Sequence, residues 1–381
     1  MDNNIRETPK TRFAYLDNVR SLVIILVIAI HSAVTYSGDG GWYYIEGSPD
    51  KLSIFEIASF GLFQSFVQAW SMGALFFISA FLATKTLARR GCLNFIKERI
   101  FRLGLPLLIY VFIISPFILF TLIDAGTGNT IIEKYINYLK SFMWVGSTGP
   151  LWFIEILLLF CLIYAVCKKF FSFKNTIHTF NTKNIILVII ITGIMAFLFR
   201  LKYPIGSSFY NLQFSYFSSY ITLFVAGIVV GENDLFENIT SEQNIRWFKI
   251  ALIAGPVIWA IIMLLGGAAQ GHRYFAGGLY WQSIAYAFWE AFVAIGFSIG
   301  IIAFFRKHIN TANKCSRLIA ENAFGIYFFH APILIIVSLL LKHWIIYPLV
   351  KFVVVTIITF FACLIFTFLV RKIKPLGVVF K

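Results

Sequence analysis

The sequence predicts an all-α, polytopic integral membrane protein with about ten transmembrane helices. Hydrophobic residues make up 59% of the chain and charged residues only 13%. The apolar runs also recur at lengths near the roughly 20 residues that a helix needs to cross a bilayer. Because the segments between the runs are too short to bury a core of their own, we expect residues 1–381 to form a single membrane domain.

Ten apolar runs are the candidate spans. In chain order, they are 22–36, 62–83, 103–123, 151–167, 185–199, 216–230, 250–265, 283–305, 324–341 and 352–370. Arg6, Lys10 and Arg12 precede the first run, as in a secretory signal peptide, but this run continues to Tyr36 with no clear cleavage site. We therefore expect an uncleaved first helix.

The distribution of basic residues predicts the orientation. If the two termini and alternate loops share one side, three quarters of the 32 lysines and arginines lie there. By the positive-inside rule this side is cytoplasmic, so residues 1–14 and 371–381 are predicted to be cytoplasmic tails of a multi-pass protein of the cell (inner or plasma) membrane. The net charge of +15 then reflects orientation and attraction to anionic membrane lipids.

Two further patterns bear on function. The chain has no basic module interleaved with aromatic residues, so we expect no nucleic-acid binding. The five cysteines have no metal-ligand spacing and lie in predicted spans or cytoplasmic loops. We therefore expect neither a metal site nor an exported disulfide.

Ionisable residues at membrane depth are the functional candidates, because such groups are costly in a bilayer. Arg20 and His31 are eleven residues apart, almost three helical turns, so they face the same way and His31 lies roughly 16 Å deeper. His330, Glu155 and Glu290 fall near the depth of His31 on three other predicted helices. Four helices can thus contribute ionisable groups to one cavity.

Basic residues at the predicted cytoplasmic end suggest a binding site for an anion. Arg99 and Arg102 are three residues apart on a helix that enters the third span, a spacing that places both on one face. With Arg20 they form a predicted cationic cluster for a phosphorylated cytoplasmic ligand. Asp17, three residues before Arg20, either supports Arg20 structurally, which we favour, or aims its guanidinium at the ligand.

Five segments resemble the acyltransferase family 3 membrane proteins and occur in the family's order over nearly the whole chain. They are Leu16-Asp17-Asn18-Val19-Arg20 followed by ten residues and His31, Phe76-Phe77-Ile78-Ser79, Arg99-Ile100-Phe101-Arg102 with Pro106, Pro150-Leu151-Trp152-Phe153, and Phe324-Gly325-Ile326-Tyr327-Phe328-Phe329-His330. The segment 31–36 looks most like the group of the osmoregulated-glucan biosynthesis protein C, a succinyltransferase. Ala80 departs from the family, which commonly has glycine after the serine.

The resemblance implies an enzyme that moves an acetyl or succinyl group from cytoplasmic acyl-coenzyme A to a hydroxyl of an extracytoplasmic glycan or glycolipid. The coenzyme A phosphates are then expected near the three arginines, with the thioester at His31. An imidazole, whose ordinary pKa is about 6.5, suits removal of a proton from the acceptor hydroxyl. His31 is therefore the predicted general base, and a transient acyl-imidazole on the same residue is the alternative.

The other intramembrane groups have less specific roles. Glu155, just after Phe153, is the better candidate for a carboxylate that holds the His31 tautomer, and Glu290 is the second. Both can instead be protonated acids hydrogen-bonded in the bundle. His330 is predicted to contact the acceptor or the thioester carbonyl, or else to pack between helices. A purely structural role in helix packing is likewise the alternative for His31.

A proton-coupled transporter or exporter is the competing hypothesis. In that case the four groups at membrane depth form a proton relay. The arginines gathered at one mouth, and the lack of Gly/Pro-interrupted helices in matching halves, favour the enzyme. The sequence leaves open the acyl group, the acceptor class, and whether the chain forms a homodimer.

Overall fold

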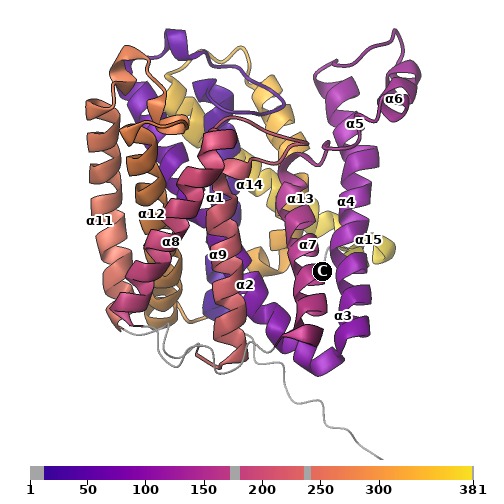
Figure 1. Cartoon of the computed structure of the whole chain (residues 1–381). Helices are drawn as coiled ribbons and strands as arrows, with labels where there is room; N and C mark the ends of the chain where they lie inside the picture. The colour runs from indigo at the N-terminus through magenta and orange to yellow at the C-terminus, as the bar shows by residue number, and fades with distance from the viewer. Residues whose placement is uncertain (1–12, 172–180, 236–241, 380–381) are drawn as a thin grey trace, which may run out of the picture.

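The computed structural model describes residues 13–171, 181–235 and 242–379, and these residues form helices and no strand. Ten helical stretches are long and apolar enough to cross a membrane, which confirms the predicted all-α, ten-span architecture (Figure 1). Most of the predicted N-terminal tail, with Arg6, Lys10 and Arg12, lies outside the described residues. Seven spans are single helices: α1 (Ala14–Ser37), α2 (Ile54–Arg90), α8 (Thr182–Lys202), α11 (Glu242–Leu265), α12 (Trp281–His308), α13 (Lys314–Leu340) and α14 (Pro348–Val370). Two more are α7 (Trp152–Phe170) and α9 (Phe217–Glu232), each together with the 3-10 turn before it. The remaining span is the stretch Cys92–Leu122.

The first two spans extend beyond the purely apolar runs. Helix α1 begins at Ala14 rather than at residue 22. Arg20 does not interrupt it, since a long basic side chain can lie along a helix and keep its charged end in a polar environment. Helix α2 begins after Ser53, whose hydroxyl accepts a hydrogen bond from the Glu56 backbone N–H while the Glu56 carboxylate accepts from the Ser53 backbone N–H. This reciprocal cap starts the helix eight residues before the predicted span.

The third span is an irregular helix. It consists of α3 (Cys92–Arg99), α4 (Leu105–Ile109) and α5 (Ser115–Phe117), each followed by a π-helical turn. Pro106 and Pro116 lie at the starts of α4 and α5, directly after such turns. A proline inside a regular helix lacks the N–H for its hydrogen bond and clashes with the preceding turn. The wider π turns accommodate both prolines without ending the helix.

The spans form an inner and an outer set. In α1, α2, α9, α12 and α13, at least two thirds of the most apolar stretch is buried, whereas less than a third is buried in α8, α11 and α14. Figure 1 shows α11 at one edge of the bundle and α3–α5 at the other, beside α7. Helix α1 packs against α2, α12, α13 and α14. The helix that carries Arg20 and His31 is therefore central.

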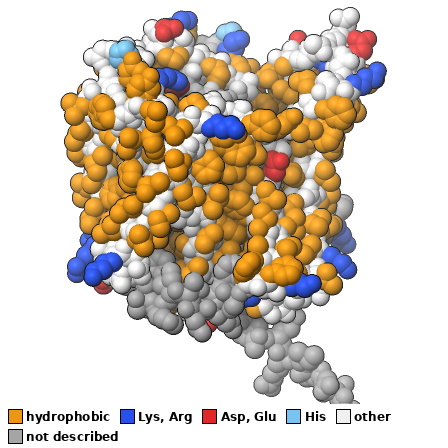
Figure 2. Space-filling view, viewed as in Figure 1, with side chains coloured by type: hydrophobic (Ala, Val, Ile, Leu, Met, Phe, Trp, Pro, Cys, Tyr) orange, Lys and Arg blue, Asp and Glu red, His pale blue; other side chains and the backbone are white. Residues whose placement is uncertain are grey.

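The surface agrees with a membrane position. On the face shown in Figure 2, hydrophobic side chains cover most of the middle of the molecule, and most charged side chains lie toward its two ends. A short amphipathic helix that we did not predict, α6 (Ile131–Lys140), lies above α5 at one end (Figure 1). The ten crossings place the start of α1 and the end of α14 on the same side. That this side is cytoplasmic stays a prediction.

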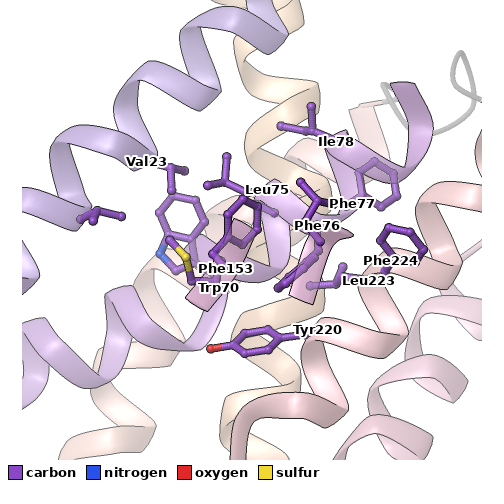
Figure 3. Close-up of a cluster of buried hydrophobic side chains, with 14 of the residues drawn as sticks. Val23, Trp70, Leu75, Phe76, Phe77, Ile78, Phe153, Tyr220, Leu223 and Phe224 are labelled. Carbon is purple, nitrogen blue, oxygen red and sulfur yellow. The ribbon is translucent and has the colours of Figure 1, made fainter. Parts of the chain in front are cut away.

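Two of the family-like segments meet in the hydrophobic core. Figure 3 shows Phe76 of α2 among aromatic side chains of neighbouring helices. Its ring centroid lies 4.6 Å from that of Phe153 and 5.2 Å from that of Tyr220. Helix α9 also approaches α2 closely at Gly227, where a Cβ atom would overlap the Phe77 carbonyl. These segments therefore hold α2, α7 and α9 together.

Candidate active site

Two histidines from different parts of the chain meet inside the bundle. His31 projects from α1 and His330 from α13, and the two helices pack against each other. His31 Nδ1 lies 3.1 Å from His330 Nε2, and the other nitrogen of His330, Nδ1, lies 2.6 Å from the Tyr327 carbonyl oxygen. His330 is fully buried, whereas His31 keeps part of its surface accessible.

These contacts determine where the protons lie in a neutral pair. A carbonyl oxygen only accepts hydrogen bonds, so His330 Nδ1 must carry a proton. This N–H donates a hydrogen bond to the Tyr327 carbonyl oxygen. Neutral His330 then has a lone pair on Nε2, and His31 Nδ1–H donates to it. This assignment leaves the lone pair of His31 on Nε2. A basic nitrogen is thus available on the partly accessible residue of the pair.

The loop that follows α1 covers His31. Trp42 in this loop stacks on the imidazole, with ring centroids 3.9 Å apart and planes at 23°. The loop is tied to the end of α1, because the backbone N–H groups of Glu46 and Gly47 both donate to the Thr35 carbonyl oxygen. Next to Trp42, burial raises the pKa of the Tyr43 phenol, whose oxygen lies 3.3 Å from the Tyr110 hydroxyl oxygen.

The segment with His330 is connected to the segment with Glu155. The Tyr327 hydroxyl donates a hydrogen bond to the Pro150 carbonyl just before α7. Glu155 lies in the first turn of α7, where the helix dipole stabilises a carboxylate. Its Oε2 is buried and has no hydrogen-bond partner among the described residues. The structure places His330, rather than Glu155, against the Nδ1 of His31.

Glu290 has a partner that the sequence analysis missed. Its carboxylate Oε2 lies 2.5 Å from Nη2 of Arg200, and both side chains are buried. The Arg200 guanidinium carbon also lies 5.2 Å from the Tyr286 ring centroid. The predicted span 185–199 ends just before Arg200, which places this arginine in a loop. An arginine one residue beyond a predicted span was the available signal.

Arg20 and Asp17 form the predicted ion pair near the start of α1. Arg20 Nη1 lies 3.6 Å from Asp17 Oδ1, and 43% of the Arg20 side chain is exposed. Because α1 is an uninterrupted helix, Arg20 and His31 lie on one face about 16 Å apart along the axis. The neighbouring Asn18 donates through its amide to the Ile309 carbonyl after α12. This contact anchors the start of α1.

Arg99 and Arg102 have different surroundings. The Arg99 guanidinium lies over the Phe95 ring, 5.0 Å from its centroid, and its buried Nε has no hydrogen-bond partner among the described residues. The Arg102 side chain is 63% exposed, and its Nε lies 3.4 Å from Oε1 of Glu98. A π-helical turn begins at Ile100, between the two arginines, so the α-helical spacing that we assumed for them does not apply.

A comparison with protein families gives a match over nearly the whole chain. The model of a family described as an acyltransferase domain matches residues 13–368. The chain belongs to acyltransferase family 3. Neither the curated proteins nor the solved structures give a match to this acyltransferase. Within its described residues, no group of three or more His, Cys, Asp or Glu side chains is placed to hold a metal ion.

The assignment of a free Nε2 to His31 predicts the reactivity of the histidines in this acyltransferase. Diethyl pyrocarbonate modifies an accessible, unprotonated imidazole nitrogen. In the folded, detergent-purified protein we expect modification of His31 and not of fully buried His330, measured by peptide mass spectrometry. Exposed His343 is the positive control. Modification of His330 with His31 untouched contradicts the assignment.

The Arg200–Glu290 pair predicts a stability effect. Replacing Arg200 with methionine leaves the Glu290 carboxylate buried and unpaired, so we expect the free energy of unfolding to fall by about 3–5 kcal/mol. The double variant Arg200→Met, Glu290→Met removes both charges and recovers most of this loss. Exposed Lys202→Met is the control, and thermal unfolding in detergent is the measurement. Equal melting temperatures for Arg200→Met and the control contradict the prediction.

Proposed function

We propose that this family 3 acyltransferase is an O-acyltransferase that moves an acetyl or succinyl group from cytoplasmic acyl-coenzyme A to a hydroxyl of an extracytoplasmic glycan or glycolipid. The histidine pair is the observation that carries this proposal. It gives His31 a basic Nε2 at a partly accessible position deep in a ten-span bundle. His31 lies six residues, about 9 Å, before the predicted outer end of α1, within reach of an acceptor from that side.

The donor binds from the opposite end in this proposal. Arg20 is partly exposed near the start of α1, and Arg99 and Arg102 lie at the predicted cytoplasmic end of the third span. Guanidinium groups bind phosphates through charge-assisted hydrogen bonds. The phosphates of coenzyme A contact these arginines, and the long arm follows α1 inward to place the thioester at His31.

The transfer step uses His31 as general base. His31 Nε2 takes the proton of the acceptor hydroxyl while the hydroxyl oxygen attacks the thioester carbonyl carbon. The new carbon–oxygen bond forms, the carbon–sulfur bond breaks, and the departing thiolate takes the proton from His31. His330 is a positioning residue, since it accepts from His31 Nδ1–H and so directs Nε2 toward the substrates. Transfer through an acyl-imidazole on His31 is the alternative route.

The roles of the acidic residues follow from their contacts. Glu290 is a structural residue in this proposal, because its carboxylate is paired with Arg200. Asp17 supports Arg20 through their ion pair. Glu155 is partly accessible although its Oε2 is buried, so its other carboxylate oxygen, beside Thr148, is the one proposed to accept a hydrogen bond from the acceptor. The enzyme lies in the cell membrane, and no metal takes part.

Loss of His31 is expected to abolish acyl transfer. In inverted membrane vesicles given isotope-labelled acetyl- or succinyl-coenzyme A, His31→Ala should reduce label in lumenal or membrane glycan by about 10²- to 10⁴-fold, the usual contribution of a general base. His343→Ala replaces an exposed histidine and should behave like the wild type. Which labelled donor is used identifies the acyl group.

The same vesicles distinguish the enzyme from a transporter. If folded wild-type protein neither releases coenzyme A nor transfers label although acceptor is present, the enzyme proposal fails. Proton flux that depends on His31 would then support the proton-coupled transporter. Full transfer by His31→Ala would contradict the role of this residue.

Removal of the arginines is expected to weaken donor binding. Arg20→Gln and Arg99→Gln should each raise the KM for acyl-coenzyme A by about 10- to 100-fold, because a charge-assisted phosphate contact contributes about 1.5–3 kcal/mol. We expect little change in kcat, since neither side chain reaches the thioester. Arg89→Gln, an exposed arginine on α2, is the matched control. An equal KM for all four proteins would exclude the proposed phosphate site.

A further inference from the structure

A cavity of about 220 Å³ lies at the predicted outer end of the bundle, where α1 ends and α14 begins. Its wall includes Glu46 and Lys51 from the loop after α1 and Lys351 from the first turn of α14. Lys342 and Trp344 from the connection between α13 and α14 also line it. None of these residues belongs to the site proposed for acyl transfer.

One wall of this cavity contains a buried charge pair. Lys351 is only 4% exposed, and its Nζ donates to Glu46 Oε1 at 2.5 Å. The same ammonium lies 5.6 Å from the Tyr36 ring centroid. A buried ammonium requires such partners, because its desolvation is costly. The same carboxylate forms a side-chain hydrogen bond with Tyr44, so Lys351 and Tyr44 together hold Glu46 in the wall of the cavity.

The charge of the cavity favours an anion. Three lysines and one glutamate line the cavity, and Lys51 and Lys342 are both exposed, whereas Lys351 is paired with Glu46. Helix α14 begins here at Pro348, and no side chain caps its N-terminus. The positive end of the helix dipole adds to the positive potential. Trp344, 43% exposed, offers a flat apolar face of the kind that packs against a sugar ring.

The cavity is connected to His31 by one short loop. Glu46 lies four residues after Trp42, which stacks on His31. The backbone N–H groups of Glu46 and Gly47 are bonded to the end of α1. A group bound beside Glu46 therefore contacts the same loop that covers the histidine.

We propose that this cavity binds a phosphate group attached to a hydroxyl-bearing sugar of the acyl acceptor. Lys51 and Lys342 bind the phosphate, Trp344 packs against the sugar ring, and Lys351 holds Glu46 in place. That the ligand is the acyl acceptor rests on the function proposed above, whereas phosphate binding does not. A phosphate on a soluble glycan and one on a lipid headgroup share this chemistry.

Binding of glucose 6-phosphate to the full chain in a detergent with a sugar-free headgroup tests the proposal. Isothermal titration should detect glucose 6-phosphate and not glucose. We expect Lys51→Gln with Lys342→Gln to weaken binding about 100-fold or more, the loss expected for two charge-assisted contacts. Lys140→Gln, an exposed lysine on α6 at the same end, is the matched control. Absence of binding by the wild type, or equal binding by the double variant, overturns the proposal.

Two further experiments complete the test. One distinguishes a lipid phosphate from a phosphate on a soluble glycan, and the other distinguishes failure of the phosphate site from failure of the proposed acyl transfer. In the same detergent, stronger displacement of glucose 6-phosphate by short-chain phosphatidylglycerol than by glycerol 3-phosphate assigns the cavity to a phospholipid-borne acceptor. Equal displacement by the two assigns it to a soluble glycan. His31→Ala should bind glucose 6-phosphate as the wild type does. If acyl transfer is absent from every protein but lysine-dependent binding persists, the proposed function fails and the phosphate site stands.

Discussion

The hydrogen bond between His31 and His330 is the contact on which the site depends. It joins residues that are 299 positions apart, so it exists only if α1 and α13 pack side by side. The Tyr327 carbonyl sets the direction of the chain of hydrogen bonds, because it forces the proton of His330 onto Nδ1. A change in α13 that moved this carbonyl would therefore alter which nitrogen of His31 is basic, although the changed residue itself does not contact His31.

The cost of charge in a membrane explains much of the surrounding structure. Arg200 and Glu290 are buried as a pair, and Lys351 is buried against Glu46. Pairing offsets part of the desolvation cost of each ion. The histidine pair avoids this cost by a different route, since two neutral imidazoles can satisfy each other and a backbone carbonyl. The bundle therefore holds a base among apolar side chains without burying an isolated charge.

Much of the fold could be predicted from the sequence, because a bilayer requires long apolar helices and all ten were visible as apolar runs. The alignment of Arg20 with His31 was equally predictable, since it needs only a regular helix. The contact of His31 with His330, the Arg200–Glu290 pair and the stacking of Trp42 were not. Each depends on which helices and loops become neighbours, and helical periodicity contains no such information.

The irregular third span also limited the prediction of the donor site, because its π-helical turns cannot be recognised from the sequence. The spacing of Arg99 and Arg102 was interpreted with α-helical geometry, and a π-helical turn between them changes the directions of their side chains. Pro106 was visible in the sequence, but a proline does not by itself reveal whether a helix ends, kinks or widens. Arg20, on a regular helix, is the firmer of the predicted donor contacts.

A structure of the full chain with a non-hydrolysable thioether analogue of acetyl-coenzyme A would test the central claim most directly. The account predicts the nucleotide phosphates at the Arg20 end of α1 and the acyl carbon within about 4 Å of His31 Nε2, close to the separation of a reactive complex. His330 should still contact His31 Nδ1. An analogue bound with its acyl group away from His31, or with His31 Nδ1 rather than Nε2 facing it, would contradict the account.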